Sequence, residues 1–179
     1  LLGLVTVGAV FGAPFITLMP VMARDRLGLD AGGYGVMLAS LGVGGLLGAL
    51  MVAGPASHWH RGRLLRTTAL AFPILVAAFA MTTQARVAEG LLFVIGIMMI
   101  MFNALSNGTL QLRVPEEYRG RLMAFYSLVF IGLSQTVGAF AVGAVARAIG
   151  VEWAVGGSAL ITLAFATWTF ARSPDLLQV

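Results

Sequence analysis

Long apolar runs separated by short polar segments dominate the pattern along this chain. Six runs contain no charged residue: Leu1–Ala23, Ala31–His60, Thr67–Ala85, Gly90–Leu112, Leu122–Ala146 and Trp153–Ala171. A helix rises about 1.5 Å per residue, so roughly 20 apolar residues cross a hydrocarbon core of about 30 Å. The pattern therefore predicts six transmembrane helices in an all-α membrane protein.

Composition supports a membrane setting. Charged residues make up 10% of the 179 residues, against about a quarter in soluble domains, and the mean hydropathy is +0.95. Too few charges are present to cover a water-soluble fold of this size. The sequence contains no cysteine, which excludes disulfides and thiolate metal sites within it.

Arginines between the runs predict the orientation. The loops after the first, third and fifth runs hold Arg24, Arg26, Arg86 and Arg147. The other loops and the C-terminal tail hold Arg61, Arg63, Arg66, Arg113, Arg119, Arg121 and Arg172. Because basic residues in short loops stay cytoplasmic, both chain ends are predicted to be cytoplasmic. The net charge of +4 is thus explained by topology and does not indicate nucleic-acid binding.

A weak internal repeat divides the six runs into three plus three. Small residues lie four apart in the second run, at Gly44 and Gly48, and in the fifth, where Ser134 precedes Gly138. Such spacing lets helices approach closely in lipid, although it is also found on ordinary packing faces. Since each unit has an odd number of helices, the second must enter the membrane from the opposite side, which makes an inverted repeat.

The start of the sequence resembles the middle of a longer protein. It has no initiator Met, and Leu1 already lies in an apolar run. We therefore expect residues 1–179 to form one domain, preceded by a missing half with six further spans.

Three stretches carry a family resemblance. They run from Tyr34 to Gly48, from Gln111 to Arg121, and from Gly138 through Gly143 to Gly150. The second contains the most specific motif, which consists of Pro115, Arg119, Gly120 and Arg121. Together they resemble the C-terminal half of the major facilitator superfamily, in particular its enterobactin-exporter-like or transmembrane secretion effector group.

The resemblance implies helices seven to twelve of a twelve-helix transporter in a bacterial inner membrane. In that fold the second and fifth spans face the other half, so the interface is expected at Gly44, Gly48, Ser134, Gly138 and Gly143. The first and fourth spans are expected to line a central cavity. Transport would proceed by alternating access, usually coupled to protons in exporters.

Polar side chains repeat along the fourth span. Asn103, Asn107 and Gln111 recur every fourth residue, and Ser106 lies on the same arc. Carboxamides cannot face lipid without leaving donors unpaired, so this face should meet protein or a wet cavity. Hydrogen bonding between helices is one explanation. The second explanation is that Asn103, Ser106 and Asn107 line a cavity. It is favoured because the resemblance places the fourth span beside the central cavity.

The first span is expected to supply the opposite wall of that cavity. It carries Phe11, Phe15 and Thr17 together with Pro14 and Pro20, which predicts a kinked helix with aromatic side chains. Aromatic surfaces suit an apolar and variable substrate.

The sequence lacks the residue patterns that several classes of protein activity require. The sequence has no phosphate-binding Gly-rich loop with Lys and no Ser/His/Asp arrangement. We therefore expect that the protein is not an enzyme and that it has no cofactor or metal site. No acidic residue lies inside an apolar run, so a proton-carrying carboxylate is expected in the missing half. We expect an exporter of small amphiphilic molecules such as drugs or siderophores. A lipid flippase of the same fold and a non-transporting scaffold or sensor are the alternatives.

Overall fold

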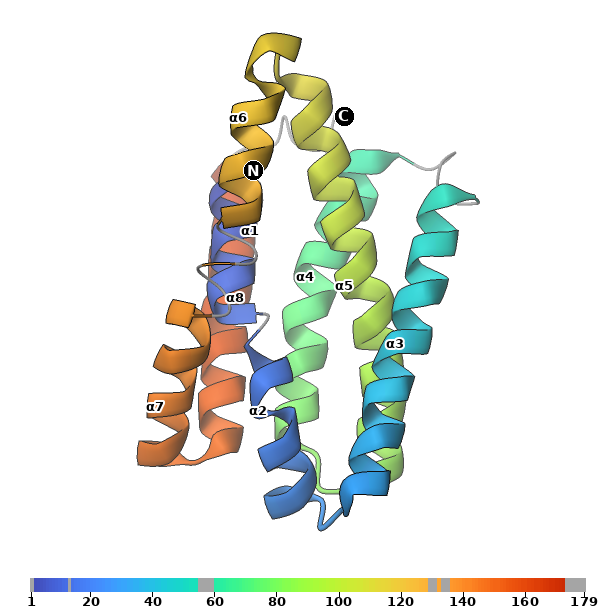
Figure 1. Cartoon of the computed structure of the whole chain (residues 1–179), viewed down its shortest axis with the longest axis vertical. Coiled ribbons are helices and arrows are strands. Elements are labelled where there is room, and N and C mark those ends of the chain that lie inside the picture. The colour runs from blue at the N-terminus through green and yellow to red at the C-terminus, as the bar shows by residue number, and fades with distance from the viewer. Residues whose placement is uncertain (1, 13, 55–59, 129–131, 133–135, 173–179) are drawn as a thin grey trace.

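All elements of the described chain are helical (Figure 1). The computed structural model describes residues 2–12, 14–54, 60–128, 132 and 136–172. In chain order the elements are α1 (Leu2–Val7), the π-helical η1 (Gly8–Gly12), α2 (Phe15–Val21), the π-helical η2 (Met22–Arg26), α3 (Ala31–Ala53), α4 (Arg61–Met81), α5 (Ala85–Arg113), α6 (Glu116–Ser127), α7 (Ala139–Ile149) and α8 (Val151–Arg172). The all-α prediction is confirmed.

Five helical stretches are long and apolar enough to cross a membrane. They are Leu2–Arg26, Ala31–Ala53, Arg61–Met81, Ala85–Leu112 and Val151–Arg172, and a shorter apolar helix covers Thr136–Ile149. The five long stretches overlap five of the predicted runs. The shorter helix overlaps the predicted run 122–146, of which residues 129–131 and 133–135 lie outside the described residues. The described part of the chain therefore contains five long apolar helical stretches and one shorter apolar helix.

Five acidic residues of the described chain lie between the apolar runs of the sequence but belong to helices in the structure, and two of them, Glu116 and Glu117, are in the first turn of α6. Asp25 belongs to η2, Glu89 to the second turn of α5, and Glu152 to the first turn of α8. The helices extend past the apolar runs because backbone hydrogen bonding continues into the membrane edge, where side chains reach water.

Proline divides the first span into segments. Pro14 precedes α2, and its carbonyl accepts hydrogen bonds from the backbone N–H groups of Thr17 and Leu18. Because proline has no N–H, Pro14 cannot donate to the carbonyl of Val10 one turn earlier. A Cβ atom added to Gly138 would lie 2.6 Å from that oxygen. Glycine at position 138 thus lets the fifth span approach the interrupted part of the first.

The most extensive helix contact joins α3 and α5, which run in the same direction (Figure 1). A Cβ atom on Gly48 would lie 2.6 Å from the carbonyl oxygen of Ile97. Cβ atoms on Gly44 and Gly96 would collide with the carbonyls of Phe93 and Leu41. Backbones can approach this closely only where side chains are absent, so the glycines define the packing of α3 on α5.

Helix α4 lies at the centre of the bundle and contacts both α5 and α8. Its Phe72 and Phe79 pack edge-to-face on Phe15 of α2, with ring centroids 6.2 and 6.3 Å apart. Edge-to-face contacts bring the positive ring edge onto the negative ring face. This aromatic cluster attaches the second half of the first span to the core.

Candidate functional site

A polar strip lies on the last turns of α5, and we define it as Asn103, Ser106, Asn107 and Gln111. Asn103 and Asn107 are half-buried, Gln111 is exposed, and Ser106 is buried. The residues lie near the end of α5 that leads into α6 because they belong to its last three turns. The strip offers amide and hydroxyl groups for hydrogen bonding to a polar ligand, and it contains no nucleophile with a base beside it.

Two strip residues contact each other. The Nε2 atom of Gln111 donates a hydrogen bond of 2.6 Å to Oδ1 of Asn107. Residues four apart stack on one helix face, so this contact follows from helical geometry. It turns the acceptor oxygen of Asn107 toward Gln111 and leaves the amide hydrogens of Asn107 for another partner.

Ser106 differs from other hydroxyl residues in the spanning helices. Ser40, Thr68 and Thr162 donate to carbonyls of their own helices at 2.8–3.0 Å. Ser106 is 0% exposed, yet its Oγ has no hydrogen-bond partner among the described residues. A buried hydroxyl without a partner is costly, so the packing of Ser106 in this conformation is unfavourable for its polar group.

The loop motif caps α5 and starts α6. Pro115 precedes the first turn of α6 in an extended conformation. Arg119 Nε donates to the carbonyl oxygens of Gln111 at 3.2 Å and Val114 at 3.4 Å, and its Nη1 lies 3.3 Å from Oε1 of Glu116. These bonds satisfy carbonyls that the helix end leaves free. Gly120 and Arg121 are exposed, and a Cβ atom on Gly120 would meet open space.

The three residues expected from the first span do not gather opposite the strip. Phe15 is 0% exposed in the aromatic cluster, so it lines no open cavity in this conformation. Phe11 is half-buried and lines an apolar groove with residues of α7 and α8. Thr17 is exposed on α2. Sequence periodicity assigned them to one helix but could not show which neighbour each side chain meets.

The interface glycines have different surroundings. Gly44 and Gly48 pack against α5, and Gly138 packs against the first span, all within this chain. A Cβ atom on Gly143 would meet open space, so this position is free to contact another partner. Ser134 lies outside the described residues.

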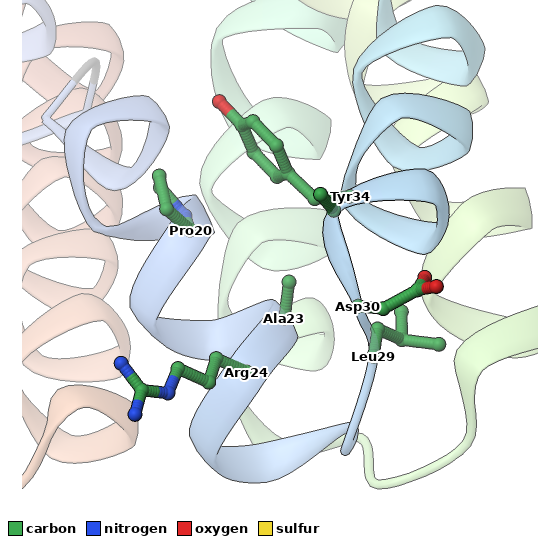
Figure 2. A pocket seen from close by; sticks show the side chains of 7 residues that line it. Pro20, Ala23, Arg24, Leu29, Asp30 and Tyr34 are labelled. Atoms are coloured by element: carbon green, nitrogen blue, oxygen red, sulfur yellow. The ribbon is translucent and has the colours of Figure 1, made fainter.

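A pocket of about 350 Å³ lies at the opposite end of the bundle from the strip, between η2 and the start of α3. Figure 2 shows the ring of Tyr34 projecting into it, whereas the side chains of Arg24 and Asp30 point away to opposite sides. Asp30 accepts a hydrogen bond of 2.8 Å from the backbone N–H of Gly33 and so caps α3. Its carboxylate is therefore used for structure.

A second cleft was missed by sequence reasoning. It has a volume of about 650 Å³ and combines apolar residues with Asp25, Arg26, Arg147 and Glu152. Arg26 and Glu152 form an ion pair across it at 3.3 Å, with side chains 29% and 22% exposed. Both residues border apolar runs in the sequence, but no local pattern shows that positions 126 apart meet.

The long apolar helices define a multi-pass membrane protein. The family model described as transmembrane secretion effector, a branch of the major facilitator superfamily, matches residues 3–175. The chain belongs to this family, whose members are transporters of the major facilitator type and not enzymes. The curated proteins and solved structures with which the chain was compared gave no significant match.

Proposed function

We propose that the protein exports small amphiphilic molecules, such as drugs or siderophores, from bacterial cells by alternating access. The observation that supports this most is the α5 polar strip, where half-buried carboxamides interrupt an otherwise apolar spanning helix. Carboxamides facing lipid would leave donors unpaired, so a wet cavity is the environment that suits them. The name of the family, which refers to secretion, supports the outward direction.

The chain would form the C-terminal half of a twelve-helix transporter, with six spans in a 3+3 inverted repeat. In this arrangement a preceding six-helix half closes the cavity, and both ends of this chain are cytoplasmic in the bacterial inner membrane. Exposed large apolar side chains on α3 and α7, among them Leu46, Leu50 and Phe140, supply surface for lipid or for that half. Gly143 adds a place for close approach, since no described residue fills the space beside it.

Cargo would bind between the two halves, with Asn103 and Asn107 as hydrogen-bonding groups. Ser106 would join them once the strip rearranges, because its hydroxyl is buried here. Phe11 and Thr17, which retain exposed surface, would contribute from the first span, whereas Phe15 would take part only after leaving the aromatic cluster. The coupling proton would be carried by a carboxylate in the preceding half.

An efflux assay tests the proposal. Cells that make the full-length protein are loaded with ethidium or with a catecholate siderophore, and cargo loss is followed with and without a proton gradient. Asn107→Leu should change efflux or cargo preference while protein abundance stays nearly constant. Ser40→Ala serves as the matched control, because it also removes a polar group from a spanning helix but bonds only to its own backbone.

The outcomes separate the alternatives. Gradient-dependent loss that responds to Asn107→Leu supports an exporter. Movement of labelled lysophospholipid without loss of either cargo would replace the exporter with a flippase. Normal export by Asn107→Leu, with unchanged preference, would remove Asn107 from the site.

A further inference from the structure

The bond between Gln111 and Asn107 determines which groups Asn107 can offer. A carboxamide carries one oxygen, which has two lone pairs, on one side and two N–H donors on the other. The oxygen of Asn107 accepts from Gln111 at 2.6 Å, and within the described part of the chain no acceptor bonds to its Nδ2. Because the oxygen is turned toward Gln111, Asn107 presents its N–H donors on the side away from Gln111.

The helix end that holds Gln111 is itself fixed. Arg119 donates to the backbone carbonyls of Gln111 and Val114, while Glu116 holds the other side of the same guanidinium. The loop motif thus anchors the last turn of α5, and that turn orients the amide one turn deeper. This connection runs from the end of the helix to the strip through contacts between residues three to eight positions apart in the sequence.

We propose that Gln111 is a positioning residue that makes the strip selective for cargo bearing a hydrogen-bond acceptor, such as a carbonyl or phenolate oxygen. This inference rests on the proposed function, because it assumes that Asn107 faces cargo. An acceptor placed against Nδ2 gains a hydrogen bond, whereas an isosteric group without the oxygen leaves the donors without that partner.

A matched pair of competitors tests this selectivity. The probes are 2-acetonaphthone and 2-isopropenylnaphthalene, which differ in having a carbonyl oxygen or a methylene at the same position. Each competes against ethidium efflux by the full-length protein. With the unmodified protein the ketone should compete about two- to tenfold better, the range expected for one net hydrogen bond.

Two variants at Gln111 change the orientation of the amide. Gln111→Met removes the donor to Oδ1, so Asn107 can turn either way and the ratio should fall close to one. Gln111→Glu supplies an acceptor that attracts Nδ2 and turns Oδ1 toward cargo, so the ratio should fall below one. Arg119 is already held by Glu116 and two carbonyls, which leaves the new carboxylate to Asn107. Because Gln111 is exposed, both variants should fold and accumulate. Measuring protein abundance checks this.

The two proposals fail differently. If ethidium is exported but the unmodified protein does not distinguish the probes, or if both variants keep its ratio, the positioning role of Gln111 is overturned and the exporter stands. If Gln111→Glu does not accumulate, an unchanged ratio in Gln111→Met alone overturns the role. If neither ethidium nor the siderophore is exported, the proposed function is overturned together with the inference.

Discussion

The guanidinium of Arg26 lies 3.3 Å from the carboxylate of Glu152 and joins the end of the first span to the start of the last. The turn before Glu152 depends on Gly150, whose φ of 98° is unfavourable for other residues. This turn places Glu152 at the cleft, next to Arg26. One contact thus fixes the relative position of segments at the two ends of the sequence.

Breaking this ion pair should destabilise the bundle. Arg26→Gln or Glu152→Gln should each lower the free energy of unfolding by about 1–3 kcal/mol, between the values for exposed and fully buried pairs. The exchanged pair Arg26→Glu with Glu152→Arg should recover part of the loss. Thermal unfolding in detergent measures all three variants beside the unmodified protein. Equal losses in the exchanged pair and the single variants would show that the ion pair itself contributes nothing.

Glycines between α3 and α5 should tolerate no larger residue. Gly48→Ala and Gly44→Ala should lower thermal stability and membrane abundance, because their methyl groups would meet the carbonyls of Ile97 and Phe93. The cost should be several kcal/mol, as for other forced overpacking, where about 1–3 kcal/mol or more is usual. Gly42→Ala is the matched control on the same helix, since its Cβ would meet open space. Losses of equal size at Gly42 and Gly48 would contradict this packing.

Removing the hydroxyl of Ser106 distinguishes a structural role of this residue from a role in transport. If its Oγ stays unpaired throughout transport, Ser106→Ala should raise stability by about 1 kcal/mol and leave efflux unchanged, because a desolvated polar group is removed. If the hydroxyl gains a partner during transport, the same change should slow efflux although stability rises. We expect the second result, read from efflux rate and thermal unfolding in parallel. Slower efflux with lower stability would show that Ser106 only holds the fold together.

Orientation can be tested with single cysteines, since this sequence has none. Glu117→Cys in the first turn of α6 should resist an impermeant thiol reagent in intact cells, because the arginine distribution predicts that this end is cytoplasmic. Thr83→Cys, between α4 and α5, should react. Both positions are exposed, so accessibility of the side chain does not bias the comparison. Any cysteine elsewhere in the full-length protein is removed first. Reaction at Glu117→Cys and protection at Thr83→Cys would reverse the orientation.

The helices and the family could be predicted because both depend on local sequence. Apolar runs of sufficient length must form helices in lipid, where every backbone group needs an internal partner. The motif around Pro115 and Arg119 lies within a few residues, and the family match over residues 3–175 confirms the family to which it pointed. The polar strip also follows from local spacing, since Asn103, Asn107 and Gln111 repeat with the helical period.

Tertiary structure decided what each face contacts. Gly44 and Gly48 were expected to face another half, but their closest neighbours are carbonyls of α5. Phe15 was expected at a cavity, but it packs between Phe72 and Phe79. Periodicity shows which residues share a face, whereas the identity of the neighbouring helix depends on contacts between segments far apart in sequence. For the same reason the pairing of Arg26 with Glu152, 126 positions apart, became visible only in the folded chain.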